Sequence, residues 1–102
     1  MEIVGAVSKK RKKGPKKLER HFKGVSNHRR IEILLLIAKD PKITLEEIVD
    51  DVNGNLKTIS EHVRRLAIAG LVEKTYAGRK VEHKLTPYGK TFAGFIETFS
   101  YS

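Results

Sequence analysis

The sequence predicts a mainly α domain built from a three-helix core, a two-stranded β-hairpin and an additional helix at each end. Two features carry this prediction. Residues 44–72 contain two short amphipathic helix patterns joined by a tight turn, and residues 72–85 alternate about a central glycine as a hairpin does. A chain of 102 residues is long enough for one domain, which buries only about 60 to 65% of its unfolded surface. We therefore expect a single domain that benefits from a partner subunit.

The first core helix is expected to follow a capping residue at Ser26 or Asn27, to run to about Lys39 and to end before Pro41. Between residues 31 and 38 it is apolar nearly all round. One face can fill the core, so the opposite face needs cover from another element. The last helix of the chain is the obvious candidate.

The second helix of the 44–72 pair ends at Gly70 and has a core side and an outer side when residues are spaced at about 100°. The residues expected to face the core are Leu56, Ile59, Val63 and Leu66. Those on the outer side and its flanks are Lys57, Thr58, Glu61, His62, Arg64 and Arg65. Such donors, acceptors and cations suit base edges and phosphates, although any solvated helix face is also polar. The segment that follows favours the first interpretation.

The residues after this helix predict a hairpin with a basic tip. Apolar and polar positions alternate on both sides of Ala77-Gly78, and Gly78 permits the positive φ of a tight turn. Arg79 and Lys80 follow the turn, where they would touch a phosphate backbone or a minor groove. His83 is expected to face solvent or that groove. The alternative is a plain surface hairpin with incidental charge.

Several short motifs occur between residues 26 and 99 in a characteristic order. They are Arg29-Arg30-Ile31 with Leu34-Leu35, Thr44 to Ile48, Thr58 to Val63 with Leu66, Ala69 to Val72, Gly78-Arg79, and Leu85 to Gly89. Because these motifs occur in this order, the chain resembles the winged helix-turn-helix transcriptional regulators, most closely the ArsR type. The last motif is equally typical of the MarR and PadR types. The resemblance implies a three-helix core, a two-stranded wing and terminal helices used for dimerisation.

The resemblance also implies which residues contact double-stranded DNA. Together with the helix pattern, it predicts a reading surface made of Asn55, Lys57, Thr58, Ser60, Glu61, His62, Arg64 and Arg65 on the recognition helix, and of Arg79 and Lys80 on the wing. Glu61 is the exception in this set, because phosphates repel a carboxylate. It either accepts a hydrogen bond from a cytosine amino group or pairs with Arg64 or Arg65, and we favour the ion pair.

The formal net charge of +9 lies entirely in the first 30 residues, since residues 31–102 carry equal numbers of basic and acidic side chains. Residues 9–17, KKRKKGPKK, contain no apolar side chain that could anchor them. We expect a flexible arm over residues 1–17 that precedes a domain at 18–102 and adds sequence-independent phosphate contacts. The contacting residues would be Lys9, Lys10, Arg11, Lys12, Lys13, Lys16 and Lys17. A nuclear localisation signal and a solubilising tail are the alternatives.

Apolar residues flank the predicted three-helix core and wing on both sides. Leu18, Phe22 and Val25 predict a short helix that runs into a break at Gly24. Residues 87–99 predict a last helix with an aromatic stripe that consists of Tyr88, Phe92, Phe95, Ile96 and Phe99. Intramolecular packing alone is one explanation of the stripe, but its width favours a homodimer interface. Two-fold symmetry would then place two reading helices about 34 Å apart, in successive major grooves.

The sequence argues against several other classes of protein. Cysteine is absent and the four histidines have no partner histidine at helical spacing, so no metal site and no cofactor are expected. No catalytic constellation is evident, and we expect no enzyme activity. No apolar run approaches the roughly 20 residues of a membrane span, so we expect a soluble protein, cytoplasmic or, in a eukaryotic or viral setting, nuclear. An effector, if there is one, would be a small apolar molecule or a protein.

The function predicted from the sequence is sequence-specific binding of duplex DNA and regulation of transcription, most simply as a dimeric repressor. The first alternative is an architectural DNA-binding protein with little sequence preference, in which the basic arm supplies most of the affinity. A second alternative is a winged-helix module that makes protein contacts within a larger transcription assembly.

Overall fold

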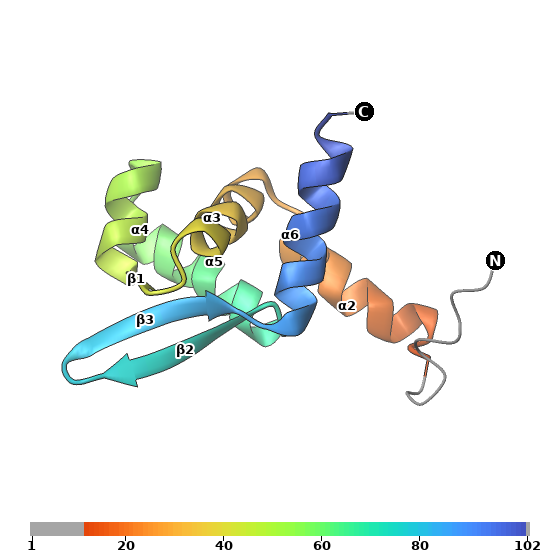
Figure 1. Ribbon diagram of the computed structural model, residues 1–102, viewed down its shortest axis with the longest axis horizontal. Helices are drawn as coiled ribbons and strands as arrows, with labels where there is room; N and C mark the ends of the chain where they lie inside the picture. The colour runs from red at the N-terminus through yellow and green to blue at the C-terminus, as the bar shows by residue number, and fades with distance from the viewer. Residues whose placement is uncertain (1–11, 102) are drawn as a thin grey trace.

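The computed structural model describes residues 12–101, which form five helices and a three-stranded antiparallel sheet (Figure 1). In chain order the elements are α2 (Pro15–Val25), α3 (His28–Lys39), β1 (Ile43–Thr44), α4 (Leu45–Val52), α5 (Leu56–Ile68), β2 (Val72–Ala77), β3 (Lys80–Leu85) and α6 (Pro87–Phe99). The strand order is β1-β3-β2. The mainly helical fold with a hairpin wing is thus confirmed.

Helix α3 is the centre of the core and packs against α2, α4, α5, α6 and β3. Its Ile33, Leu34 and Ile37 are fully buried, and they meet Ile48 of α4 and Leu66 of α5 in one cluster. Each such side chain stabilises the fold by about 1.5 to 3 kcal/mol relative to an exposed one. This shared core fixes the angle between the two helices of the predicted DNA-reading unit.

The predicted boundaries of α3 and the following helix are set by side-chain caps. Asn27 accepts hydrogen bonds from the backbone N–H groups of Arg29 and Arg30, so it is the cap of α3. At the start of α4, Thr44 accepts from the N–H of Glu47, whose carboxylate in turn accepts from the N–H of Thr44. This reciprocal arrangement satisfies two amide groups that the helix itself leaves free.

Helix α2 begins earlier and ends later than expected. It starts at Pro15, a residue suited to the first turn of a helix, so Lys16 and Lys17 of the predicted arm are helical. Gly24 lies inside the helix rather than at a break, because α2 packs there on the C-terminal end of α5: a Cβ at Gly24 would come within 2.1 Å of the Ala69 Cβ. Residues 1–11, with most of the predicted arm, lie outside the described part of the chain.

The sheet has one more strand than predicted, and this strand explains His83. Ile43 and Thr44 of β1 pair with His83 and Glu82 of β3. His83 is therefore only 2% exposed, and its Nδ1 donates to the Ile43 carbonyl at 3.0 Å. Burial lowers the pKa of this imidazole below its usual range. The expectation that His83 faces solvent or a DNA groove is wrong, because strand alternation places it on the buried side with Leu85.

The wing itself is confirmed. Strands β2 and β3 pair from Val72↔Leu85 to Ala77↔Lys80 and are joined by a turn in which Gly78 has a φ of 64°. Glycine adopts this backbone conformation without steric cost. The hairpin projects beyond the helices, so its tip is the most distant point of the sheet from the core (Figure 1).

Candidate nucleic-acid interface

A tight turn between α4 and α5 sets the direction of α5 relative to α4. Asn53 adopts a left-handed conformation with a φ of 52°, and Gly54 donates its N–H to the Val49 carbonyl at 3.0 Å. Gly54 also lies against the core, since a Cβ there would come within 2.6 Å of Ile59. Asn55 then caps α5 by accepting from the N–H groups of Lys57 and Thr58. The first turn of α5 is thereby held in one conformation.

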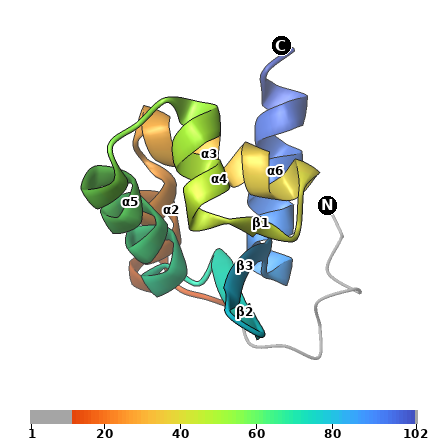
Figure 2. The ribbon, with the colours of Figure 1, turned by 90° about the vertical axis from the view of Figure 1, so that its left-hand side faces the viewer.

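The outer face of α5 is made by the residues that its periodicity predicted. Ile59, Val63 and Leu66 are buried. The exposed polar residues are Lys57, Thr58, Ser60, Arg64 and Arg65, with Glu61 and His62 half-buried beside them. This outer face of α5 and helix α6 lie on opposite sides of the molecule, so a partner of one does not obstruct the other (Figure 2).

Leu56 corrects one prediction for this helix. It was expected in the core but is 55% exposed, because it is the first residue of α5 and extends past the edge of the core. An exposed leucine beside Lys57 and Thr58 adds an apolar group to the reading surface. Such a group suits the methyl group of thymine.

Glu61 forms the predicted ion pairs. Its carboxylate accepts two hydrogen bonds from Arg64, at 2.9 and 2.8 Å, and one from Arg65 at 2.9 Å. The two bonds from Arg64, and then the one from Arg65, lower the pKa of Glu61 to about 2. Both guanidinium groups are consequently held against a permanent negative charge in the free protein.

Arg30 of α3 belongs to the same surface, although its position in the sequence gave it no role. Its Nη1 donates to His62 Nδ1 at 3.4 Å. A guanidinium can only donate, so Nδ1 accepts and neutral His62 carries its proton on Nε2. Burial, and then the charge of Arg30, lower the pKa of His62. His62 therefore presents an N–H donor in its neutral form, which suits a phosphate oxygen or a guanine acceptor.

Arg29 ties the other end of the reading unit to α3. Its Nη1 donates to the carbonyl of Val52, at the end of α4, at 2.7 Å, and to Glu32 at 3.1 Å. A cation at the C-terminal end of a helix is favourable because carbonyl groups there lack partners. Arg29 and Arg30 thus fix α4 and α5 relative to the same helix.

The wing offers cations at its tip. Arg79 and Lys80 are exposed at the turn, as predicted, and Tyr76 beside them is 74% exposed. At the base of the hairpin Lys84 pairs across the strands with Glu73 at 3.9 Å. Arg79 and Lys80 therefore place two positive charges at the end of the wing that projects furthest, and Lys74 is exposed further along β2.

The predicted arm is only partly described. Lys16 and Lys17 are exposed on α2, and Lys13 lies 4.6 Å above the ring of Tyr88 on α6. Lys12 is exposed. The remaining predicted contacts of the arm, Lys9, Lys10 and Arg11, lie outside the described residues.

The aromatic stripe of α6 is part of a larger apolar surface. Phe92 and Ile96 are half-buried, whereas Tyr88, Phe95 and Phe99 are exposed, the last two by 56% and 66%. Leu18 and Phe22 of α2 extend the stripe, and the ring of Phe22 packs edge-on against Phe92 at 5.0 Å. We call these seven residues the aromatic face. The contribution of α2 was missed because the sequence does not show which helices lie side by side.

Residues 12–101 contain neither a metal-binding cluster nor a membrane-spanning helix. No group of three or more His, Asp or Glu side chains is arranged to hold a metal ion there. Within the same part of the chain, the helices are too short or too polar to cross a membrane.

Comparison with known proteins agrees with this geometry. Residues 26–73 match the family model for winged helix-turn-helix DNA-binding domains. Comparison with curated protein sequences gives no significant match.

Solved structures with the same architecture come from distant sequences. HlyU from Vibrio cholerae superposes with a TM-score of 0.78 at 19% identity over 90% of this chain and 100% of that one. The homodimeric winged helix-turn-helix domain of Mb0332 from Mycobacterium bovis, described as a possible ArsR-family transcriptional regulator, gives 0.76 at 22% identity over 98% of this chain and 87% of that one. FabT of Streptococcus pneumoniae, solved in complex with DNA, superposes with a TM-score of 0.68 at 16% identity, over 82% of this chain and 65% of FabT. The chain thus has the winged helix-turn-helix fold that these structures share.

Proposed function

We propose that this protein binds duplex DNA in a sequence-specific manner and regulates transcription, as a dimeric repressor. The observation that carries the proposal is the outer face of α5, where exposed donors and cations are held in place by a capped first turn and by ion pairs along the helix. The match to a family described as DNA-binding, and the DNA complex of the similar FabT, support it. The proposed activity is binding and involves no chemical step.

The proposal assigns different roles to different parts of the surface. Lys57, Thr58 and the Nε2–H of His62 would read base edges, with Leu56 beside a thymine methyl group. Asn55, Ser60, Arg64 and Arg65 would contact phosphates around them, together with Arg79 and Lys80 at the wing tip. Glu61 would act indirectly, by restraining the two arginines.

The aromatic face supplies the proposed dimer contact. Its exposed phenylalanines and leucine lie on α2 and α6, and α6 lies on the side of the molecule opposite α5. A contiguous apolar surface of this kind on a small protein marks an interface. The similar Mb0332 domain is homodimeric. A two-fold axis through this face would direct two copies of α5 into successive major grooves, about 34 Å apart.

The basic N-terminal segment has a separate role in this proposal. Its lysines and arginine would contact phosphates without reading bases and so increase the affinity for every duplex equally. The protein would then act where the DNA is, at the nucleoid in the cytoplasm. Removal of residues 1–11, the segment before the described chain, should weaken binding to all duplexes alike and flatten the salt dependence. A loss confined to one sequence would contradict this role.

The first experiment measures specificity directly. A duplex selected by the protein from a random pool and a scrambled version of it are titrated at two salt concentrations. A regulator should prefer the selected duplex by about 10³ or more, whereas an architectural protein binds both alike. Weak binding to both duplexes even at low salt would instead indicate a module for protein contacts.

Single substitutions then locate the reading surface. Lys57→Ala and Thr58→Ala should change which sequence is selected, because they remove base contacts. Lys23→Ala on α2 is the matched control and should leave the selected sequence unchanged. If the α5 substitutions only scale the affinity for all duplexes, base reading lies elsewhere.

A further inference from the structure

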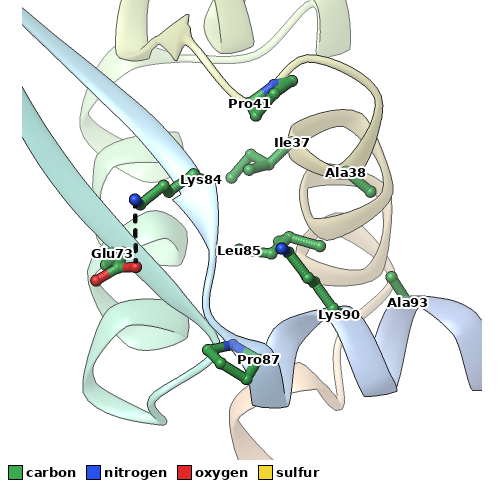
Figure 3. Close-up of a pocket in the computed structure, with 9 residues that line it drawn as sticks. All are labelled: Ile37, Ala38, Pro41, Glu73, Lys84, Leu85, Pro87, Lys90 and Ala93. Carbon is green, nitrogen blue, oxygen red and sulfur yellow. Dashed lines mark ion pairs between the residues drawn. The ribbon is translucent and has the colours of Figure 1, made fainter.

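A cavity of about 410 Å³ lies at the base of the wing, between α3, β3 and the start of α6 (Figure 3). The apolar part of its wall comes from Ile37, Ala38, Leu85 and Ala93, with Pro41 and Pro87 at opposite ends, and the polar part comes from Glu73, Lys84 and Lys90. None of these residues belongs to the outer face of α5 or to the aromatic face. The cavity therefore stays open when either of those surfaces is occupied.

Two lysines flank the opening of this apolar space. The Nζ of Lys84 is 3.9 Å from a carboxylate oxygen of Glu73, so this pair is neutral overall. Lys90 forms no ion pair with the described residues and carries the excess positive charge. Figure 3 shows its side chain extending from α6 toward the cavity, which it lines together with Leu85. One positive charge is thus left uncompensated beside apolar walls.

We propose that this cavity binds a compact amphipathic monocarboxylate. The apolar body would lie against Ile37, Leu85 and Ala93, and the carboxylate would bind Lys90 and compete with Glu73 for Lys84. The volume suits a small molecule, since ligand pockets begin at about 300 Å³. A single charge matches the single excess cation, whereas Glu73 would repel a more highly charged anion.

The cavity is connected to the reading helix through Thr86, which stands between two of its lining residues, Leu85 and Pro87. The Thr86 hydroxyl donates to the Gly70 carbonyl at 2.6 Å, and its backbone N–H donates to the Leu71 carbonyl at 3.1 Å. Gly70 and Leu71 directly follow the end of α5. A ligand that presses on Leu85 and Pro87 would therefore shift the end of α5 together with the wing.

The effect on DNA rests on the proposed function, but ligand binding does not. If the carboxylate changes the affinity for DNA by some factor, thermodynamic linkage requires that DNA changes the affinity for the carboxylate by the same factor. The ligand site can therefore be tested first without DNA.

Cyclohexanecarboxylate is a suitable probe, with cyclohexanol and cyclohexylamine as matched compounds that lack the charge or reverse it. In an NMR titration we expect saturable shifts at Ile37, Leu85 and Ala93, with a dissociation constant on the order of 1 mM for so small a ligand. The alcohol should bind more weakly, and the amine should not bind there. Shifts confined to the aromatic face, or equal binding of the amine, would overturn the proposal.

Exposed substitutions test the charges without affecting the core. Lys90→Gln should weaken binding of the carboxylate by about two- to fivefold and leave binding of cyclohexanol unchanged. Glu73→Gln should strengthen it, because Lys84 loses its competing partner. Lys23→Gln and Glu97→Gln, which alter charges elsewhere on the surface, should have no effect. Unchanged carboxylate affinity in both of the first two variants would refute the assigned site.

The proposed coupling between the cavity and α5 is tested by separate measurements. At saturating carboxylate the amide signals of Gly70 and Leu71 should move in the DNA-free protein, and the DNA dissociation constant of the selected duplex should change. Binding in the cavity with both amide signals unmoved would contradict the coupling. Failure of the protein to bind DNA at all, with the carboxylate site intact, would reject the proposed function and leave the site established.

Discussion

Replacement of Glu61 by glutamine should strengthen binding to every DNA duplex without increasing the preference for one sequence. In the free protein Glu61 accepts three hydrogen bonds from Arg64 and Arg65 and holds both guanidinium groups on the surface of α5. With a pKa of about 2, the carboxylate is charged at every working pH. Glu61→Gln removes this charge with little change of shape, so the two arginines become available to phosphates.

The size of the effect follows from phosphate neutralisation. Each additional phosphate contact steepens the slope of log K against log salt by about 0.9. Two released arginines would therefore add up to about 1.8 to the slope per subunit. If the electrostatic contribution vanishes near 1 M salt, each contact corresponds to about an eightfold gain in affinity at 0.1 M.

Fluorescence anisotropy at four salt concentrations, with the selected and the scrambled duplex, measures this change. We expect affinity for both duplexes to rise and the ratio between them to fall or stay constant. Glu97→Gln on α6 removes one negative charge on another helix and should leave both titrations unchanged, since charges beyond about 10 Å are screened at 0.1 M salt. A selective loss of affinity for the selected duplex would show that Glu61 accepts from a cytosine, and the reasoning would be wrong.

Three further predictions address the fold, the dimer and the buried histidine. Gly89→Ala should lower the free energy of unfolding, measured with denaturant, by about 1 to 3 kcal/mol, because the added Cβ would lie 2.0 Å from the Leu71 carbonyl oxygen. Gly94→Ala is the control: no atom lies within 4 Å of its added Cβ, so the substitution should be neutral or stabilising. Phe95→Lys should convert a dimer into a monomer of 11.6 kDa by light scattering, and an unchanged mass would remove the aromatic face as the interface. Because burial keeps the pKa of His83 below 6.5, the unfolded chain takes up a proton that the folded one excludes, so stability should fall as pH decreases below about 6.5. His83→Gln should show a shallower decrease between pH 7 and 5, and an equal slope would exclude His83 as a source of the acid sensitivity.

Periodicity and capping signals predicted most of the helices well. Asn27 and Pro41 predicted where α3 begins and ends, and the local sequence pattern alone predicted the order of α4, α5 and the hairpin. These features depend on residues within one or two turns of each other. For the same reason the ion pairs of Glu61 could be predicted, since their partners lie three and four residues away on the same helix.

The errors arose where distant segments meet. His83 is buried because β1, some 40 residues earlier, pairs with its strand. Gly24 is helical because Ala69 lies against it, and Phe22 belongs to the aromatic face because α2 lies beside α6. Leu56 has the periodicity of a core residue, but the core ends before it. Local sequence does not contain the tertiary contacts that decide these four cases.

Chemical-shift mapping of the full chain with the selected duplex tests the central claim most directly. If α5 and the wing bind DNA, the largest amide shifts should fall on Lys57 to Arg65 and on Arg79 and Lys80, with Phe95 and Ala93 little affected. If those residues of α5 stay unchanged while another surface of the protein responds, α5 is not the reading helix and the account is contradicted.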